Sequence, residues 1–184
     1  QWRVLEQALA AGKTRSVGCI NFCTGALGCL LTSATVKPAV NYFMLHAGMG
    51  PDAHGQRTFG EVRGVRTFAY GALGEPGPDS TLLSSPVLVA IAAAHGRSPE
   101  EVALRWVLQS GCAVSVRPTA DFALGRSRCE TREQCETPLV KRARVFDWKL
   151  TGSEMKNIDS LKAPDGNPTL FSSAGCPGPS PLRP

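Results

Sequence analysis

Short apolar segments alternate with segments of helical periodicity along this chain, and this alternation restricts the possible folds more than any other feature. The apolar segments are short enough for buried strands, and each switch is marked by Gly, Pro or Asn. Predicted strands cover 16–20, 38–45, 65–70 and 112–116, and predicted helices cover 1–13, 24–34, 53–62, 85–96 and 98–111. Strands and helices in this order form βαβ units with parallel strands. The sequence therefore predicts an α/β fold.

Two capping boxes mark the starts of helices. Ser98 is a typical N-cap residue and Glu101 completes the box, while Gly111 marks the end of the same helix. Thr151 and Glu154 repeat the pattern near the end of the chain. These are the sharpest local signals in the sequence.

Composition excludes several classes of protein. The formal net charge is +5, but the basic residues are scattered except at 140–145 and are not interleaved with aromatic residues, so we expect no nucleic-acid partner. The apolar run 86–94 is about half the length of a bilayer-spanning helix, and no charged leader opens the chain, which favours a cytoplasmic protein without a membrane span. The nearest of the seven cysteines, Cys19 and Cys23, lack a second pair at zinc-site spacing, so we expect reduced thiols and no metal site.

Three polar or aromatic residues lie at or just past the ends of predicted strands. They are Asn21, Tyr70 and Arg117. In parallel α/β folds the carboxyl ends of the strands carry the ligand site, so these residues are candidates for binding. The alternatives are that Asn21 caps the next helix or shapes a turn, that Tyr70 is a core aromatic, and that Arg117 is a solvated surface residue.

Five segments resemble, in sequence and in order, the second half of the aldo-keto reductases. They read GKTRSVGCINF, KPAVNYFMLH, FAYGALG, LLSSPVLVAIAAAHGRSPEEVALRWVLQSG and VFDWKLTGSEMKNID. The resemblance implies a parallel (β/α)8 TIM barrel, of which this chain would supply strands five to eight with their helices. It also implies one oxidoreductase domain at 1–161, with a divergent insertion at 125–144, and a Pro/Gly/Ser-rich disordered tail at 162–184.

The resemblance also implies an NADPH site. Asn21 matches the family residue that hydrogen-bonds the nicotinamide carboxamide, and Tyr70 matches the tyrosine on which the nicotinamide stacks. Leu73 and Gly74 match the loop over the pyrophosphate, and Arg117 matches the basic residue at the adenosine 2′-phosphate. An amide suits a carboxamide because both donate and accept hydrogen bonds, and a guanidinium makes two-pronged phosphate contacts.

Several positions depart from the family pattern. Ile20 replaces a serine, Tyr42 replaces the glutamine that also holds the carboxamide, and Gly71 with Ala72 replaces a Ser-Pro pair. The family residues that complete the grip on adenine after Arg117 are not found.

The catalytic Asp, Tyr, Lys and His of the family belong to the first half of the barrel, so we expect no catalytic residue in this chain and no activity from it alone. The predicted function is NADPH-dependent reduction of aldehydes or ketones by a longer enzyme, with a small-molecule carbonyl substrate and the N-terminal half of the barrel as the required partner. The alternative is a non-catalytic nucleotide-binding or interaction subunit, or a degenerate family product.

Overall fold

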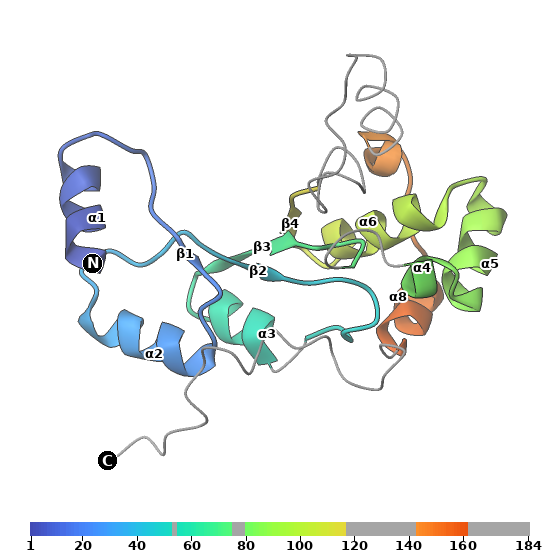
Figure 1. The fold of residues 1–184 in the computed structure, drawn as a ribbon, viewed down its shortest axis with the longest axis horizontal. Coiled ribbons are helices and arrows are strands. Elements are labelled where there is room, and N and C mark those ends of the chain that lie inside the picture. The colour runs from blue at the N-terminus through green and yellow to red at the C-terminus, as the bar shows by residue number, and fades with distance from the viewer. Residues whose placement is uncertain (53–54, 75–79, 117–142, 162–184) are drawn as a thin grey trace. The chain divides into compact units, whose positions relative to one another are not determined.

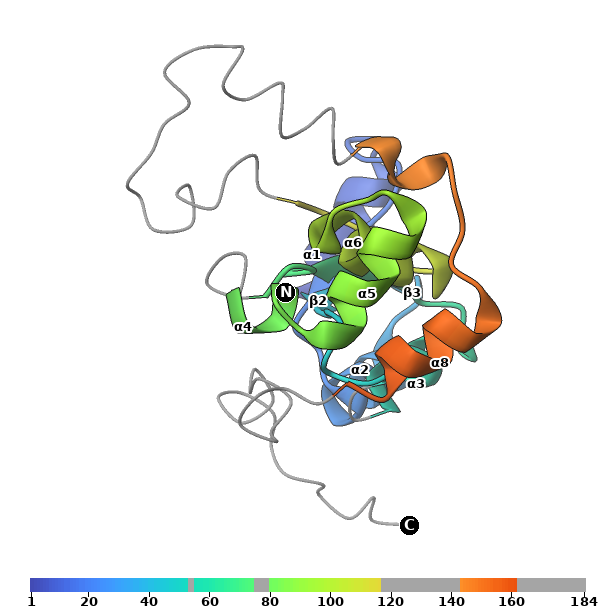
Figure 2. The same cartoon turned by 90° about the vertical axis from the view of Figure 1, so that its right-hand side faces the viewer.

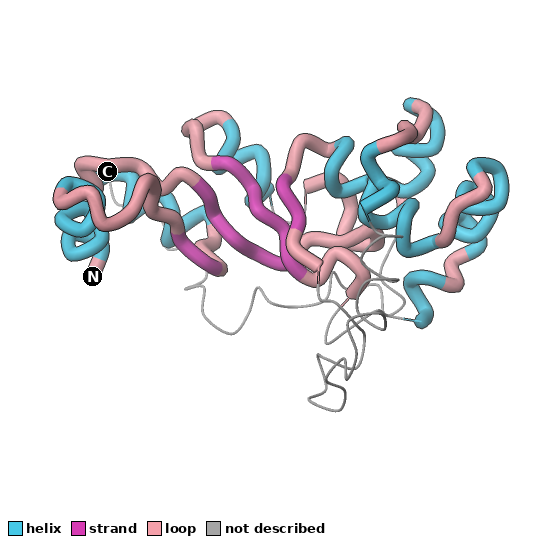
Figure 3. Tube along the Cα trace, turned by 90° about the horizontal axis from the view of Figure 1, so that it is seen from above, coloured by secondary structure: helices cyan, strands magenta, loops and turns pink. Residues whose placement is uncertain are grey.

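The computed structural model describes residues 1–52, 55–74, 80–116 and 143–161 of the 184-residue chain. Strands and helices alternate in these residues, as predicted (Figure 1, Figure 3). One four-stranded sheet has its strands in chain order, β1-β2-β3-β4. The described chain divides into two compact units, of which the first holds Gln1–Phe43 and Asp52–Phe68 and the second holds Met44–Pro51 and the described residues from Ala69 onwards.

Each element of the first unit lies within a segment predicted to have the same secondary structure. They are α1 (Trp2–Ala10), β1 (Cys19–Ile20), α2 (Thr24–Ser33), most of β2 (Val40–Met44), α3 (Gln56–Glu61) and the start of β3 (Arg66–Tyr70). β1 and β2 pair in parallel, with Cys19 opposite Asn41. The two described end strands of the sheet, β1 and β4 (Ala113–Val114), are shorter than predicted. Each pairs on one side only within the described sheet, which leaves fewer ladder hydrogen bonds to extend it.

Burial alternates along the strands of the first unit. In β2 the side chains of Asn41 and Phe43 are buried, whereas Val40 and Tyr42 are half-buried. Such alternation is typical of a sheet that has one face packed against helices. Leu27 of α2, which is fully buried, belongs to the core of this unit.

The second unit is a helical layer with the ends of β2 and β3. It contains α4 (Ser80–Leu83), α5 (Pro86–His95), α6 (Pro99–Gln109), β4, η3 (Arg144–Phe146) and α8 (Gly152–Asp159). Figure 2 shows α5, α6 and α8 packed together. Their shared core includes Leu88, Val102, Trp106 and Ile158, each fully buried.

Both predicted capping boxes are present in the second unit. The Ser98 side chain accepts a hydrogen bond from the Glu101 backbone N–H, and Thr151 does the same with Glu154. α5 ends at Gly96, which adopts a left-handed φ of 60° that favours glycine. Strong local signals therefore placed these helix ends correctly.

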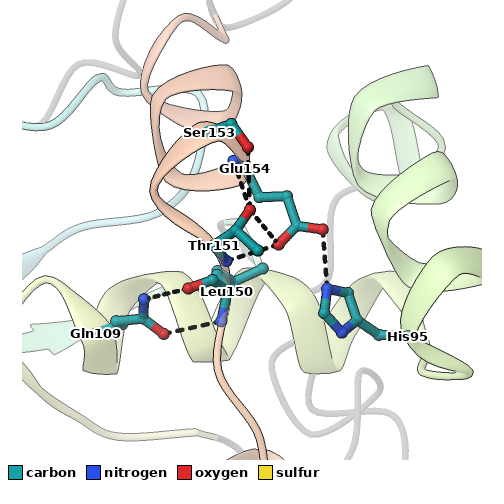
Figure 4. Close-up of polar contacts among 6 residues, drawn as sticks. All are labelled: His95, Gln109, Leu150, Thr151, Ser153 and Glu154. Carbon is teal, nitrogen blue, oxygen red and sulfur yellow. Dashed lines mark hydrogen bonds and ion pairs between the residues drawn. The ribbon is translucent and has the colours of Figure 1, made fainter.

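Side chains of α5 and α6 hold the start of α8 (Figure 4). Gln109 Nε2 donates to the Leu150 carbonyl at 2.7 Å, and the Leu150 N–H donates to Gln109 Oε1 at 3.0 Å. His95 Nε2 lies 2.8 Å from Glu154 Oε1. Trp106 Nε1 donates to Asp159 Oδ1 at 2.9 Å at the far end of the helix. α8 is therefore held at both ends by contacts with α5 and α6.

The described cysteines do not all have free thiols. Cys23 is disulfide-bonded, whereas Cys19, Cys29 and Cys112 are free, so the expectation of reduced thiols throughout was wrong for Cys23. None of the helices in the described ranges is long and apolar enough to cross a membrane.

A methyl group at Gly60 should destabilise the first unit. A Cβ added there would lie 2.9 Å from the Val65 backbone oxygen, which cannot move aside easily. We expect Gly60→Ala to lower the free energy of unfolding by about 1–3 kcal/mol in urea denaturation. The control Gly25→Ala adds its methyl group in open space on a helix, and should be neutral or stabilising by up to about 1 kcal/mol. Equal stability of the two variants would contradict this account.

The Glu154 carboxylate should make the stability of the second unit depend on acidic pH. The hydrogen bond from the Thr151 backbone N–H lowers the pKa of Glu154 below its ordinary value of 4.5, and the His95 contact acts in the same direction. Because the pKa is lower in the folded state, this stabilisation is complete above pH 4.5 and is lost as the pH falls through the folded-state pKa.

Thermal denaturation between pH 3 and 7 tests this prediction, with the range chosen to span the ordinary carboxyl pKa. Glu154→Gln keeps an acceptor for Thr151 but cannot ionise, so the gap in melting temperature between wild type and variant should widen as the pH rises. Glu61→Gln, at a carboxylate whose side chain is 43% exposed on α3, is the control. Parallel pH profiles of the wild type and Glu154→Gln would contradict the prediction.

Candidate functional site

Asn21 directly follows β1 and turns the chain towards α2. Its φ of 56° is left-handed, and no other non-glycine residue in the described part of the chain has a positive φ. Its N–H donates to the Tyr42 carbonyl at 2.8 Å, which extends the ladder between β1 and β2 by one bond. Asparagine tolerates this conformation better than most residues. Asn21 therefore shapes the turn, but it does not cap α2, whose N-cap residue is Cys23.

Two carboxamide side chains hold the residue after Asn21. Asn41 Nδ2 donates to the Phe22 carbonyl at 2.7 Å, and the Phe22 N–H donates to Asn41 Oδ1 at 3.2 Å. Gln56 Nε2, from the first turn of α3, donates to the same carbonyl at 2.7 Å. The sequence reasoning missed both residues. The available signal was a polar Asn41 within an otherwise apolar strand, which requires buried partners.

The Cys19 thiol lies beside the same carboxamide. It donates to Asn41 Oδ1 at 3.5 Å and to the Val40 carbonyl at 3.7 Å. Burial raises the pKa of Cys19 to about 11. This thiol is therefore protonated at neutral pH and acts as a weak donor rather than as a nucleophile.

Tyr42 and Ile20 occupy the positions where the family resemblance expects polar groups. They are paired across β1 and β2, and the Tyr42 ring packs on Phe68 with centroids 4.8 Å apart and planes tilted by 47°. Ile20 is 56% exposed. The two polar side chains expected here are thus replaced by one apolar side chain, Ile20, and one aromatic side chain, Tyr42.

Tyr70 ends β3 in the second unit and leads into a tight turn. Its carbonyl accepts a hydrogen bond from the Leu45 N–H at 3.1 Å, and its side chain is half-buried. Gly71 and Gly74 have φ values of 63° and 100°, and the Gly74 N–H donates to the Gly71 carbonyl at 2.8 Å. The side chain of Leu73 is buried, with 6% exposed. This turn therefore presents backbone rather than the Leu73 side chain.

The predicted site residues do not all lie in one described unit. Asn21 belongs to the first unit, whereas Tyr70, Leu73 and Gly74 belong to the second. Arg117, the tail 162–184 and all but the last two residues of the predicted insertion 125–144 lie outside the described residues. Within the described ranges no cluster of three or more His, Cys, Asp or Glu side chains could hold a metal ion.

The chemistry of these residues suits a nicotinamide coenzyme in part. The Asn21 side chain carries both a donor and an acceptor for a carboxamide, and the half-buried Tyr70 ring has an aromatic face for a heterocycle. The Gly74 N–H, by contrast, is already bonded within its own turn.

Comparison with known proteins identifies the family. The Aldo/keto reductase family model matches residues 1–163. NADPH-dependent codeinone reductase 1-4 of Papaver somniferum is 29% identical over 165 residues, and Aldo-keto reductase family 1 member A1 of Rattus norvegicus is 30% identical over 169 residues. Each match covers 87% of this chain but 46% of the relative, so the chain spans about half the length of these relatives.

A solved structure supports the same conclusion. The aldose reductase of Schistosoma japonicum has a TM-score of 0.70 and 26% identity to this chain, and the match covers 88% of this chain and 47% of that one. The likeness agrees with the α/β fold and with the parallel pairing of β1 and β2. With its parallel α/β sheet and a family match over most of its length, this chain belongs to the aldo/keto reductase family.

Proposed function

We propose that this chain supplies the second half of a (β/α)8 barrel and that the complete barrel reduces aldehydes or ketones to alcohols with NADPH. The observation that carries the proposal is Asn21, which stands in a left-handed conformation directly at the carboxyl end of β1. The ligand sites of (β/α)8 barrels lie at this end of the strands. Family membership and the name of the NADPH-dependent poppy relative support the coenzyme.

The roles of the binding residues follow from their chemistry. When bound, NADPH supplies a hydride to the carbonyl carbon of the substrate. Asn21 would hold the carboxamide and Tyr70 would support one face of the nicotinamide ring, while the backbone at Leu73 and Gly74 would border the pyrophosphate. Arg117 would bind the 2′-phosphate, and the preference for NADPH over NADH would depend on it.

Reduction also requires a proton at the carbonyl oxygen, and we assign no donor in this chain. Its two tyrosines are Tyr42, whose ring packs on Phe68, and Tyr70, which is assigned to stacking. We propose that the N-terminal half of the barrel supplies the donor and that these 184 residues are inactive alone. A small carbonyl compound as substrate and a cytoplasmic location complete the proposal.

A second candidate function is nucleotide binding without catalysis. The side chains of Ile20 and Tyr42 favour it. Ile20 has no hydrogen-bonding group to replace the expected serine, and the Tyr42 ring, packed on Phe68, replaces the carboxamide of the expected glutamine. Such a protein would bind the coenzyme weakly and would transfer no hydride.

Fluorescence titration with NADPH tests the binding roles. Tyr70→Phe keeps the aromatic ring and should bind like the wild type. Tyr70→Ala should weaken binding by about two- to tenfold, since aromatic contacts contribute about 0.5–1.5 kcal/mol. Arg117→Ala should weaken the binding of NADPH but not the binding of NADH. Arg15→Ala, at an exposed arginine, is the control. Unchanged affinity in Tyr70→Ala would contradict the stacking role.

The polypeptide isolated from its source cells distinguishes the two candidate functions. A mass about twice that of these 184 residues, with oxidation of NADPH by a small aldehyde, is the expected result for the reductase. Binding of NADPH without oxidation would favour the second candidate.

A further inference from the structure

We propose that Asn41 and Gln56 are positioning residues that hold Asn21 in its left-handed conformation. The inference deepens the proposed function, on which it rests for the ligand that Asn21 would meet. Its structural part stands on contacts that all lie within the first unit.

Hydrogen bonds restrain the peptide groups on both sides of Asn21. The preceding peptide is held because the Asn21 N–H donates to the Tyr42 carbonyl at 2.8 Å. The following peptide is held because the Phe22 N–H donates to Asn41 Oδ1 at 3.2 Å. Two restrained peptide planes leave little freedom to the φ and ψ angles between them. The φ of 56° is therefore imposed from outside Asn21, against the usual preference for negative φ.

The next peptide group is held twice. Its carbonyl, that of Phe22, accepts hydrogen bonds from Asn41 Nδ2 and Gln56 Nε2, both at 2.7 Å. Asn41 thus contacts both the N–H and the C=O of one residue. Gln56 adds a bond from a different element, α3.

Both side chains are themselves anchored. Asn41 is 2% exposed, so water does not reach its carboxamide. Losing one of these hydrogen bonds would therefore leave a buried polar group unpaired, which is costly. Gln56 stands in the first turn of α3, where Asp52 Oδ1 accepts from the Arg57 N–H at 2.9 Å and so holds the start of the helix. The backbone conformation at Asn21 in turn sets the direction of its Cβ, and with it the reach of its carboxamide.

The experiment is NMR on the complete polypeptide, with and without NADPH. A left-handed residue gives a strong cross-peak between its own amide and Hα protons, because φ brings them close. Gln56→Ala should weaken this cross-peak at Asn21. Asn41→Ala should weaken it further and accelerate exchange of the Phe22 amide by about five- to tenfold, the loss of one hydrogen bond.

Matched variants distinguish a loss of positioning at Asn21 from a general loss of stability in the first unit. Asn41→Asp keeps the acceptor for the Phe22 N–H, so it should largely preserve the protection of that amide against exchange. It also replaces Asn41→Ala in the experiment if the alanine variant does not fold. Gln7→Ala and Asn157→Ala, at exposed carboxamides, should change neither signal. The Val65 amide, bonded to the Gly60 carbonyl in the same unit, should exchange at the wild-type rate in every variant.

The outcomes are distinct for the inference and for the function on which it rests. The inference would be overturned if the Asn21 cross-peak and the Phe22 exchange rate were unchanged in both alanine variants. It would also be overturned if exchange of the Val65 amide accelerated as much as exchange of the Phe22 amide. Failure of the wild type to bind NADPH would instead overturn the proposed function, while the Asn21 signals would still decide the conformational claim. If the wild type binds, Gln56→Ala should bind NADPH several-fold more weakly, and unchanged affinity would remove the link to the coenzyme.

Discussion

The need to pair buried polar groups determines how each unit of this chain is held together. In the first unit the carboxamide of Asn41 is almost completely buried and is bonded to Phe22 and Cys19. In the second unit the indole N–H of the fully buried Trp106 donates to Asp159, and Gln109 exchanges two hydrogen bonds with Leu150. A buried polar group without a partner costs about 1–3 kcal/mol, so each pairing strongly selects one arrangement of the elements it joins.

The same constraint connects the fold to the candidate site. The Asn21 backbone N–H donates to the Tyr42 carbonyl of β2. In our proposal the conformation of Asn21 also depends on the side chains of Asn41 in β2 and Gln56 in α3, which bond to Phe22. Where the family pattern is polar, this chain has Ile20 and Tyr42, and Tyr42 is occupied by packing on Phe68. Of the three positions to which the family resemblance assigns a carboxamide contact, the chain therefore keeps the asparagine at Asn21 and has different side chains at Ile20 and Tyr42.

Local chemistry explains which structural predictions succeeded. Ser98 with Glu101 and Thr151 with Glu154 form capping boxes from residues three apart, so their geometry depends on one turn of helix. The end of α5 at Gly96 was also predictable, because the left-handed φ of this residue depends on the glycine itself and not on distant contacts. The lengths of β1 and β4 were overestimated, since a strand extends only where a neighbour supplies hydrogen bonds. The hydrogen bond between Gln56 and Phe22 joins residues that are distant in the chain, and no local pattern encodes it.

The sequence by itself determined the α/β class, the order of the elements, the helix caps and the family resemblance, because these depend on periodicity and on residues close together in the chain. It also pointed to Asn21 as a residue at a strand end. Only the tertiary structure decided that Asn21 is left-handed, that Asn41 and Gln56 hold its neighbour, and that the Gly74 N–H is used within its own turn. These features depend on which distant groups meet when the strands pair and the helices pack, and chain spacing does not encode those distances.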